Sequence, residues 1–530
     1  MEIPMTRNAP IRKLLPLALA VAGVAAAAQP RTPVQVRAPS VDGGDEDPWY
    51  LCWFRDLNNN RIDDEIEDFE IGAPMRVDFM VTFERAAYAA DRDSLVAELD
   101  AIAAPFGGHV EQAFEILPSV LVVGTELNYP LWDNFFNTYL DPFFINLFMV
   151  PMPLPVVMVE SIHQSGPGAA VAPCSTTLSD PLFDSDFLAD SNVLPAVWDT
   201  TGGEWPCGTS GLSTTVAIVD AGVDGYGSID PLKLAGGYDA VAGMELDPAD
   251  QTGPTGADNL WHGTRVGHVA MGLDRAYGVA PFAALIDVNI AYAHTDTLPE
   301  GHTTSDRILA AFDWLLAHKD DTWSPIGAPS IDIGRIDAVN VSYTDHGPIA
   351  VRFLPIPTSP GAPMGLSDGS DLLSRAVDSL VVNGGMPVVV GAGNDGEAGA
   401  GFGGLAAAAN AITVGAYDSA EPDSSVAWSN HGVGIYGVVK PDLVGSGVDI
   451  YTGGAKGSGT SFAAPQVAGA VALMRSAHPT ATPAELARAL RDSAVPPEGS
   501  SGYHSYFGYG RLDVEGALAV IDTLVGGGAP

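Results

Sequence analysis

The sequence predicts an α/β protein whose helices cover both faces of a central parallel sheet, with a smaller α+β domain before it. Short apolar runs rich in β-branched residues recur within residues 192–525, with helical spacing between them. Strand-like and helix-like segments also alternate earlier, within residues 76–165. Buried parallel strands are apolar throughout because helices shield both of their faces, so a three-layer α/β/α arrangement follows.

The composition is that of a globular and strongly acidic protein. The 530 residues carry a formal net charge of −41, with 65 acidic side chains against 24 basic ones. This charge excludes nucleic acid as a natural partner and suits an extracellular protein kept soluble by like charges. Adaptation to salt and an ordinary acidic surface explain it equally well.

Residues 1–28 predict a secretory signal peptide. Arg7, Arg12 and Lys13 precede an apolar stretch over residues 14–24, and small alanines follow it. A short membrane anchor is the alternative, although the stretch falls below the roughly 20 residues that span a bilayer. We therefore expect a secreted or periplasmic protein that has no membrane contact once the leader is removed.

Residues 29–75 predict a linker followed by a candidate calcium loop. Oxygen-bearing side chains at closely spaced positions can converge on one Ca²⁺ ion, which takes six to eight oxygen ligands. The candidate ligands are Asp56, Asn58, Asn60, Asp64 and Glu67. The segment resembles the aspartate-rich loops of thrombospondin type 3 repeats, except that Arg61 stands where those loops carry glycine. A solvated acidic turn is the alternative.

The chain has three cysteines, Cys52, Cys174 and Cys207. In an oxidising compartment we expect a disulfide between Cys174 and Cys207, because both flank the start of the large domain. Cys52 would then stay unpaired.

Two sets of predicted elements follow from the hydrophobic pattern. Residues 76–165 carry strands at 77–83, 110–114, 119–123 and 156–160, and a helix at 94–104. Residues 192–525 carry buried strands at 215–219, 284–290, 338–342, 387–391 and 411–414, with helices that include residues 308–315 and 373–380.

Three segments supply the residue types that acyl transfer needs: a carboxylate, an imidazole and a hydroxyl. Asp220 ends a buried strand before a glycine-containing turn, and His262 begins a helix together with Gly263. Ser461 begins a helix made almost wholly of small and apolar residues. Taken singly, these could be a turn aspartate, a surface histidine and a helix N-cap.

Together, and in the chain order Asp, His, Ser, the segments resemble those of the subtilisin-like peptidases, or subtilases. The resemblance covers residues 194–518 and implies that Asp220, His262 and Ser461 are a catalytic triad on a subtilisin-like fold. It also implies that Asn394, in Val-Gly-Ala-Gly-Asn-Asp-Gly, donates to the oxyanion together with the Ser461 backbone N–H.

Further family features are implied with less sequence detail. The segment ending in Ser342 and Tyr343 resembles the one that pairs with extended substrate, although Tyr343 and Thr344 replace the usual Leu-Gly. Arg265 likewise replaces a common second histidine. The order of elements in residues 76–165 resembles the family propeptide, which acts as a chaperone and inhibitor, and residues 166–191 would then be the processing linker.

The sequence thus predicts a secreted serine endopeptidase, made as an autoprocessed zymogen, that acts on proteins or peptides through an acyl-enzyme on Ser461. We expect a monomer that needs no cofactor for catalysis, with Ca²⁺ as a structural ion. Two alternatives stay open: a catalytically silent protein with the same fold, and a hydrolase of esters or short peptides. The P1 preference does not follow from the sequence.

Overall fold

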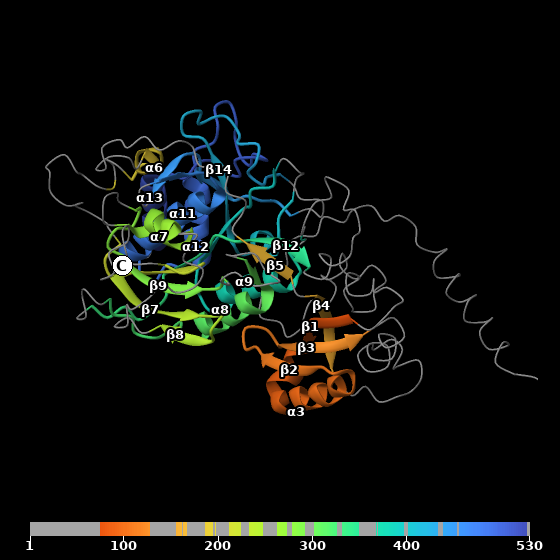
Figure 1. The fold of residues 1–530 in the computed structure, drawn as a ribbon. Helices are drawn as coiled ribbons and strands as arrows, with labels where there is room; N and C mark the ends of the chain where they lie inside the picture. Colours follow the sequence, from red (N-terminus) through yellow and green to blue (C-terminus); the bar gives the residue numbers. More distant parts are fainter. Residues whose placement is uncertain are drawn as a thin grey trace, which may run out of the picture. The chain divides into compact units, whose positions relative to one another are not determined.

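Eight strands form the central sheet of the computed structural model, and neighbouring strands in its described part run parallel except β7 and β8 (Figure 1). In sheet order they are β15 (Leu443–Ser446), β14 (Ile412–Tyr417), β13 (Val388–Gly391), β11 (Ala338–Val341), β6 (Thr215–Asp220), β9 (Ala284–Asn289), β7 (Leu234–Asp239) and β8 (Met244–Leu246).

The structure describes residues 75–127, 155–161, 163–166, 186–193, 197, 211–223, 233–246, 262–272, 278–291, 302–325, 331–348, 367, 369–396, 401–432, 438–452 and 455–526. The predicted signal peptide, the candidate calcium ligands, the three cysteines and residues 167–185 of the predicted processing linker lie outside these ranges.

The five predicted strands of the central sheet are confirmed as β6, β9, β11, β13 and β14. The sequence does not predict β7, because Leu-Ala-Gly-Gly-Tyr-Asp contains two glycines, which weaken the strand signal. The close approach of β7 to β9 requires glycine at position 237. A Cβ atom there would be 2.0 Å from the Asp287 carbonyl oxygen, so only glycine lets β7 and β9 approach in this way.

Two helical layers cover the sheet, and alternate side chains of β6 point into the two cores between them. Ala217 and Val219 pack with α8 (Ser305–Ala317), α9 (Leu372–Val382) and α10 (Gly404–Ala407). Val216 and Ile218 belong to the core on the other face. The helices of that core are α6 (Asp186–Asp190), α7 (His262–Met271), α11 (Thr460–Ala477), α12 (Pro483–Ser493) and α13 (Val514–Gly526).

The predicted three-layer α/β/α fold is therefore confirmed. Figure 1 shows α7, α11, α12 and α13 gathered together, apart from α8 and α9. No helix within the described residues is long and apolar enough to cross a membrane.

A four-stranded antiparallel sheet in the order β2-β3-β1-β4 forms the α+β unit near the N-terminus. Its elements are β1 (Met75–Phe83), α3 (Arg85–Ala103), η2 (Ala104–Phe106), β2 (His109–Ala113), β3 (Ser119–Leu127) and β4 (Val156–Ser161). The helix begins at Arg85, nine residues before the predicted start at 94. Asp91 has a non-helical backbone (φ −156°, ψ 61°), and this kink explains why the helical pattern is recognisable only after it.

Side chains and backbone groups of the α+β unit contact α8 and α9. Asp313 of α8 accepts hydrogen bonds from the backbone N–H groups of Glu115 (2.7 Å) and Ile116 (2.6 Å). Glu160 of β4 is 1% exposed, accepts from the Leu372 N–H at 3.0 Å and pairs with Arg375. The unit also contributes apolar side chains to the core beneath α8 and α9, namely Met80, Phe114, Ile116, Leu117 and Leu121.

A second short sheet contains the strand that follows the α+β unit. β5 (His163–Gly166) pairs antiparallel with β10 (Thr303–Thr304) on one side and with β12 (Thr344–Pro348) on the other. Figure 1 shows β5 beside β12. A segment from upstream in the chain is thus held in extended form between two strands of the large domain.

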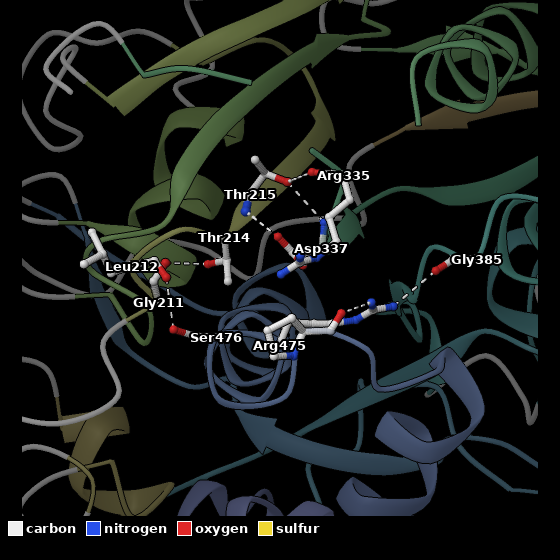
Figure 2. Close-up of polar contacts among 10 residues, drawn as sticks. Gly211, Leu212, Thr214, Thr215, Arg335, Asp337, Gly385, Arg475 and Ser476 are labelled. Carbon is white, nitrogen blue, oxygen red and sulfur yellow. Dashed lines mark hydrogen bonds and ion pairs between the residues drawn. The ribbon is translucent and has the colours of Figure 1, made fainter. Parts of the chain in front are cut away.

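The amino ends of β6 and β11 are joined by a polar network (Figure 2). Thr215 donates its backbone N–H to the Asp337 carboxylate at 3.0 Å and its hydroxyl to the Arg335 carbonyl oxygen at 2.9 Å. Burial raises the pKa of Asp337, against the opposing effect of the Arg335 guanidinium, with which it forms an ion pair.

The last turn of α11 is tied to loops at the same edge of the sheet (Figure 2). The Ser476 hydroxyl donates to the Leu212 carbonyl oxygen at 3.0 Å, and Arg475 donates to the Gly385 carbonyl oxygen at 3.2 Å. These bonds fix the end of the helix that lies far in sequence from Ser461.

Candidate active site

Asp220 lies at the carboxyl end of β6, where parallel sheets present their functional groups. Its side chain is 0% exposed. The Oδ1 atom accepts a hydrogen bond from the Ala221 N–H at 2.7 Å and lies 2.7 Å from Nδ1 of His262. A carboxylate in this position favours the tautomer with the proton on Nδ1, which leaves Nε2 as a base.

His262 is the first residue of α7, and Gly263 allows the helix to start so close to β6. A Cβ atom on Gly263 would lie 2.2 Å from the Gly222 carbonyl oxygen and 3.1 Å from the Asp220 Cβ. Any larger residue would push the helix away from the strand. The glycine after the histidine is thus what brings the imidazole to the carboxylate.

Ser461 is the second residue of α11, and it is 5% exposed. The preceding turn depends on Gly459, whose φ of 154° disfavours any other residue. Among the described residues, the Ser461 hydroxyl bonds to the Ser342 carbonyl oxygen at 3.4 Å and not to the His262 ring. The helix carrying it is buried through Arg475, so the serine lies at the positive end of a desolvated helix dipole.

Asn394 follows β13 and is 8% exposed. Its Oδ1 atom accepts hydrogen bonds from the backbone N–H (2.9 Å) and the hydroxyl (3.0 Å) of Thr460. These two bonds fix the orientation of the amide, because the oxygen must face Thr460 and the Nδ2 donor must point elsewhere. Nδ2 lies close to Gly459, at 3.3 Å from where a Cβ would be.

Ser342 and Tyr343, the predicted substrate-binding residues, follow β11 and are 2% and 1% exposed. Ser342 receives a hydrogen bond from Asn340 and donates its hydroxyl to the Ser461 carbonyl oxygen at 3.2 Å. It thereby joins the end of β11 to the start of α11. One residue later, at Thr344, β12 begins and pairs antiparallel with β5.

Two aromatic rings flank the His262 imidazole. The Tyr343 ring meets it edge to face with centroids 6.2 Å apart, and the Phe462 ring lies 6.3 Å away. Burial, and then the Asp220 charge, raises the pKa of Tyr343 well above its usual value. Arg265, on the same helix as His262, lies over the Phe462 ring at 4.9 Å, and burial lowers its pKa.

Thr460, Asn340 and Phe462 are further parts of this site that the sequence does not predict. Thr460 stands between the glycine and the serine of a segment already singled out, but its contact with Asn394 joins positions 66 residues apart. Only the fold shows that contact. The sequence signal for Thr460 is its place as a polar residue at the start of a helix that is otherwise small and apolar.

A hydroxyl, an imidazole, a carboxylate and an amide therefore gather at the carboxyl edge of the sheet. This is the set of groups that acyl transfer uses: nucleophile, base, orienting acid and oxyanion donor. Within the described ranges, no group of three or more His, Cys, Asp or Glu side chains is arranged to hold a metal ion.

Comparison with known proteins identifies the family of this chain. Residues 211–510 match the model of the subtilase family, Peptidase_S8. Subtilisin DY of Bacillus licheniformis is 26% identical over 317 residues, which cover 58% of this chain and 92% of that protein. The subtilisin of Bacillus pumilus is 28% identical over 320 residues, with the same coverage.

A solved structure shares the fold. The crystal structure of fervidolysin from Fervidobacterium pennivorans, described as a keratinolytic enzyme related to subtilisin, superposes with a TM-score of 0.56 at 18% identity. The match covers 85% of this chain and 62% of fervidolysin. With the family model spanning more than half of its residues, this chain belongs to the subtilase family of serine-type endopeptidases.

Proposed function

We propose that the enzyme cuts peptide bonds through an acyl-enzyme on Ser461, with His262 as general base, Asp220 as its orienting partner and Asn394 as oxyanion donor. The 2.7 Å contact between Asp220 Oδ1 and His262 Nδ1 carries this proposal. It selects the tautomer that can accept the serine proton, and the Phe462 ring beside His262 belongs to the residue that follows Ser461.

The reaction begins when the Ser461 hydroxyl turns from the Ser342 carbonyl toward Nε2 of His262. Oγ then attacks the substrate carbonyl carbon while Nε2 takes the proton, and Asp220 stabilises the imidazolium. The Asn394 amide and the Ser461 backbone N–H donate to the oxyanion. His262 next returns the proton to the leaving amine, and a water molecule hydrolyses the acyl-enzyme by the same steps. This chemistry needs no cofactor.

Substrate would bind as an extended strand between β10 and β12, next to Ser342 and Tyr343. The support is β5, which already pairs antiparallel with both strands. Main-chain pairing of this kind gives affinity for peptides of many sequences, which suits protein substrates better than small esters.

The α+β unit would be the propeptide of a zymogen that processes itself. Its chain runs from β4 directly into β5, between the two strands proposed to bind substrate. Asp313 and Glu160 attach the unit to α8 and α9, and its apolar side chains fill the core beneath them. These contacts support an inhibitor whose folded domain packs on α8 and α9 and whose C-terminal segment occupies the proposed substrate-binding position.

Labelling and processing test these proposals together. The wild type is expected to react with a fluorophosphonate probe, clear casein and lose its N-terminal segment by mass spectrometry; Ser461→Ala is expected to do none of these. Equal processing in both proteins would exclude self-cleavage. Labelling without casein turnover, but with ester turnover, would favour the ester hydrolase, and no labelling would favour the silent protein.

Asn394→Leu is expected to lower kcat by about 10²- to 10³-fold with little change in KM, because the donor acts on charge that exists only in the transition state. That magnitude was measured on a subtilisin and is a family value, not one derived from this geometry. Steady-state kinetics on a peptide substrate would check it. An equal rise in KM would instead assign Asn394 to ground-state binding.

Asp313 predicts a pH dependence for the attachment of the α+β unit. Burial raises the pKa of its carboxyl to about 6, against the lowering effects of the Ile116 N–H and of Arg92. A pKa raised on folding contributes stability that is complete below the ordinary value near 4 and lost as the pH rises through about 6. Attachment should therefore weaken from pH 4 to pH 7 by up to about 100-fold, because the pKa differs by about two units between the two states.

The pH dependence can be measured as thermal unfolding of the full chain between pH 4 and pH 7, in a Ser461→Ala background that prevents self-digestion. Asp313→Asn should flatten this part of the curve, while Asp320→Asn, at an exposed carboxylate of the same region, should not. Parallel curves for Asp313→Asn and its parent would contradict the prediction.

We further propose that the mature enzyme works outside the cytoplasm as a monomer and carries structural Ca²⁺. The leader-like pattern of residues 1–28 and the net charge of −41 support the first point. The spacing of oxygen-bearing side chains at residues 56–67 supports the second.

A further inference from the structure

The Asp220 carboxylate has one oxygen whose bonding the proposed mechanism does not explain. Oδ1 serves both Ala221 and His262, but Oδ2 is buried and has no hydrogen-bond partner within the part of the chain that the structure describes. Leaving a buried charged oxygen unpaired is costly, and buried polar atoms in native proteins nearly always have a partner.

Asn289 presents the complementary group. It is the last residue of β9 and is 0% exposed. Its Oδ1 accepts a hydrogen bond from the Ala291 N–H at 3.0 Å, which fixes the amide orientation. Its Nδ2 is buried and, among the described residues, donates to no acceptor.

The two unpaired atoms belong to neighbouring residues on one face of the sheet. Asp220 and Asn289 are register partners on the parallel strands β6 and β9, which lie about 4.8 Å apart. Ile218, two residues before Asp220, and Leu285, four residues before Asn289, both pack in the core under α7 and α11. Because side chains alternate along a strand, Asp220 and Asn289 both point to that face.

We propose that Asn289 is a positioning residue of the catalytic apparatus, whose amide supports the ionised carboxylate of Asp220 at Oδ2, the oxygen that does not contact His262. Since Oδ2 and Nδ2 make no direct hydrogen bond in the described structure, the link is one bridging water molecule that donates to Oδ2 and accepts from Nδ2. The inference rests on the proposed role of Asp220. It adds a fourth member to the chain that runs from the amide through the carboxylate and imidazole to the serine.

The other groups near this carboxylate do not supply a donor for Asp220 Oδ2. His262 of α7 takes Oδ1, and Tyr343, after β11, feels the Asp220 charge. Asp287, two residues earlier on β9, accepts a hydrogen bond from the Val223 N–H and is itself an acceptor when ionised. Of the side chains on the adjoining strand β9, Asn289 is the one that brings an unpaired donor to this level of the sheet.

Asn289→Leu and Asn289→Asp test the proposal in the processed enzyme, through the pH profile of kcat/KM on a peptide substrate. The leucine removes the donor at similar size, and we expect about tenfold lower kcat/KM. The aspartate keeps the shape but adds negative charge beside Asp220. It should stabilise the imidazolium and move the acid limb of the profile to higher pH.

Ser446→Ala is the matched control, because Ser446 is also a buried strand residue with an unpaired oxygen in the described structure, but on β15. It should leave the acid limb of the profile unchanged. If the two Asn289 variants behave like Ser446→Ala, the proposed role is wrong. If Asn289→Leu does not fold, the isosteric Asn289→Asp still tests the proposal, through the position of the acid limb of its pH profile.

Asp220→Asn, in the same assay, separates this inference from the proposed function. Loss of activity in Asp220→Asn with an unchanged acid limb in Asn289→Asp would remove only Asn289 from the apparatus. Full activity in Asp220→Asn would overturn the triad itself.

Discussion

Alanine at Ser461, at His262 or at both positions is expected to lower kcat by nearly the same factor, about 10⁶, which is the magnitude measured on a subtilisin. The reason is that the hydroxyl attacks only while the imidazole takes its proton, so removing either partner removes the whole step. Residual hydrolysis from the Asn394 amide and substrate binding should remain in all three variants.

Kinetics on a peptide substrate, with active-site titration, would measure these effects. Ser476→Ala is the matched control, because its hydroxyl bonds to Leu212 at the other end of the same helix and should leave kcat unchanged. Losses that multiply in the double variant would contradict a nucleophile and base that act as one unit.

Asp220→Asn is expected to lower kcat by about 10⁴-fold, the magnitude measured for the same exchange in another serine peptidase. The new amide can donate toward Nδ1, which favours the tautomer whose proton is on Nε2. That tautomer cannot accept the Ser461 proton. Since the side chain is fully buried and shape is retained, folding should be largely preserved.

The pH profile of Asp220→Asn provides the check. Activity should partly return at high pH, where hydroxide can replace the imidazole as base. Asp442→Asn removes another buried carboxylate, the partner of Lys440 at 2.8 Å, and should lower the melting temperature with kcat intact. A small effect on kcat in Asp220→Asn would mean that another group orients His262.

Where the sequence carries runs of apolar β-branched residues, it predicts the central sheet well. β6, β11 and β13 are Val- and Ile-rich because helices cover both of their faces. β7 is not predicted because its two glycines are required by contacts far away in the sequence: Gly237 by the Asp287 backbone of β9, and Gly236 by the Trp323 ring.

The residue types of the candidate site are also predictable, because local features mark each of them: a strand end, a helix start and a glycine turn. Their mutual support is not. Thr460 and Asn394, or Asn289 and Asp220, lie 66 and 69 positions apart, and their relation depends on strand register and helix docking. The separation of two residues in the sequence does not indicate that they lie close together in the fold.

The hydrogen bonds at the C-terminal end of α11 separate a structural edge of the sheet, where substitutions should affect mainly stability, from the edge that carries the catalytic groups. The helix is anchored through Arg475 and Ser476 some 14 residues from the nucleophile, and the amino ends of β6 and β11 are cross-linked at the same edge. Substitutions that raise thermal stability, such as cavity-filling side chains or added cross-links, could therefore be placed at the amino edge of the sheet. The catalytic groups at its carboxyl edge would keep their alignment.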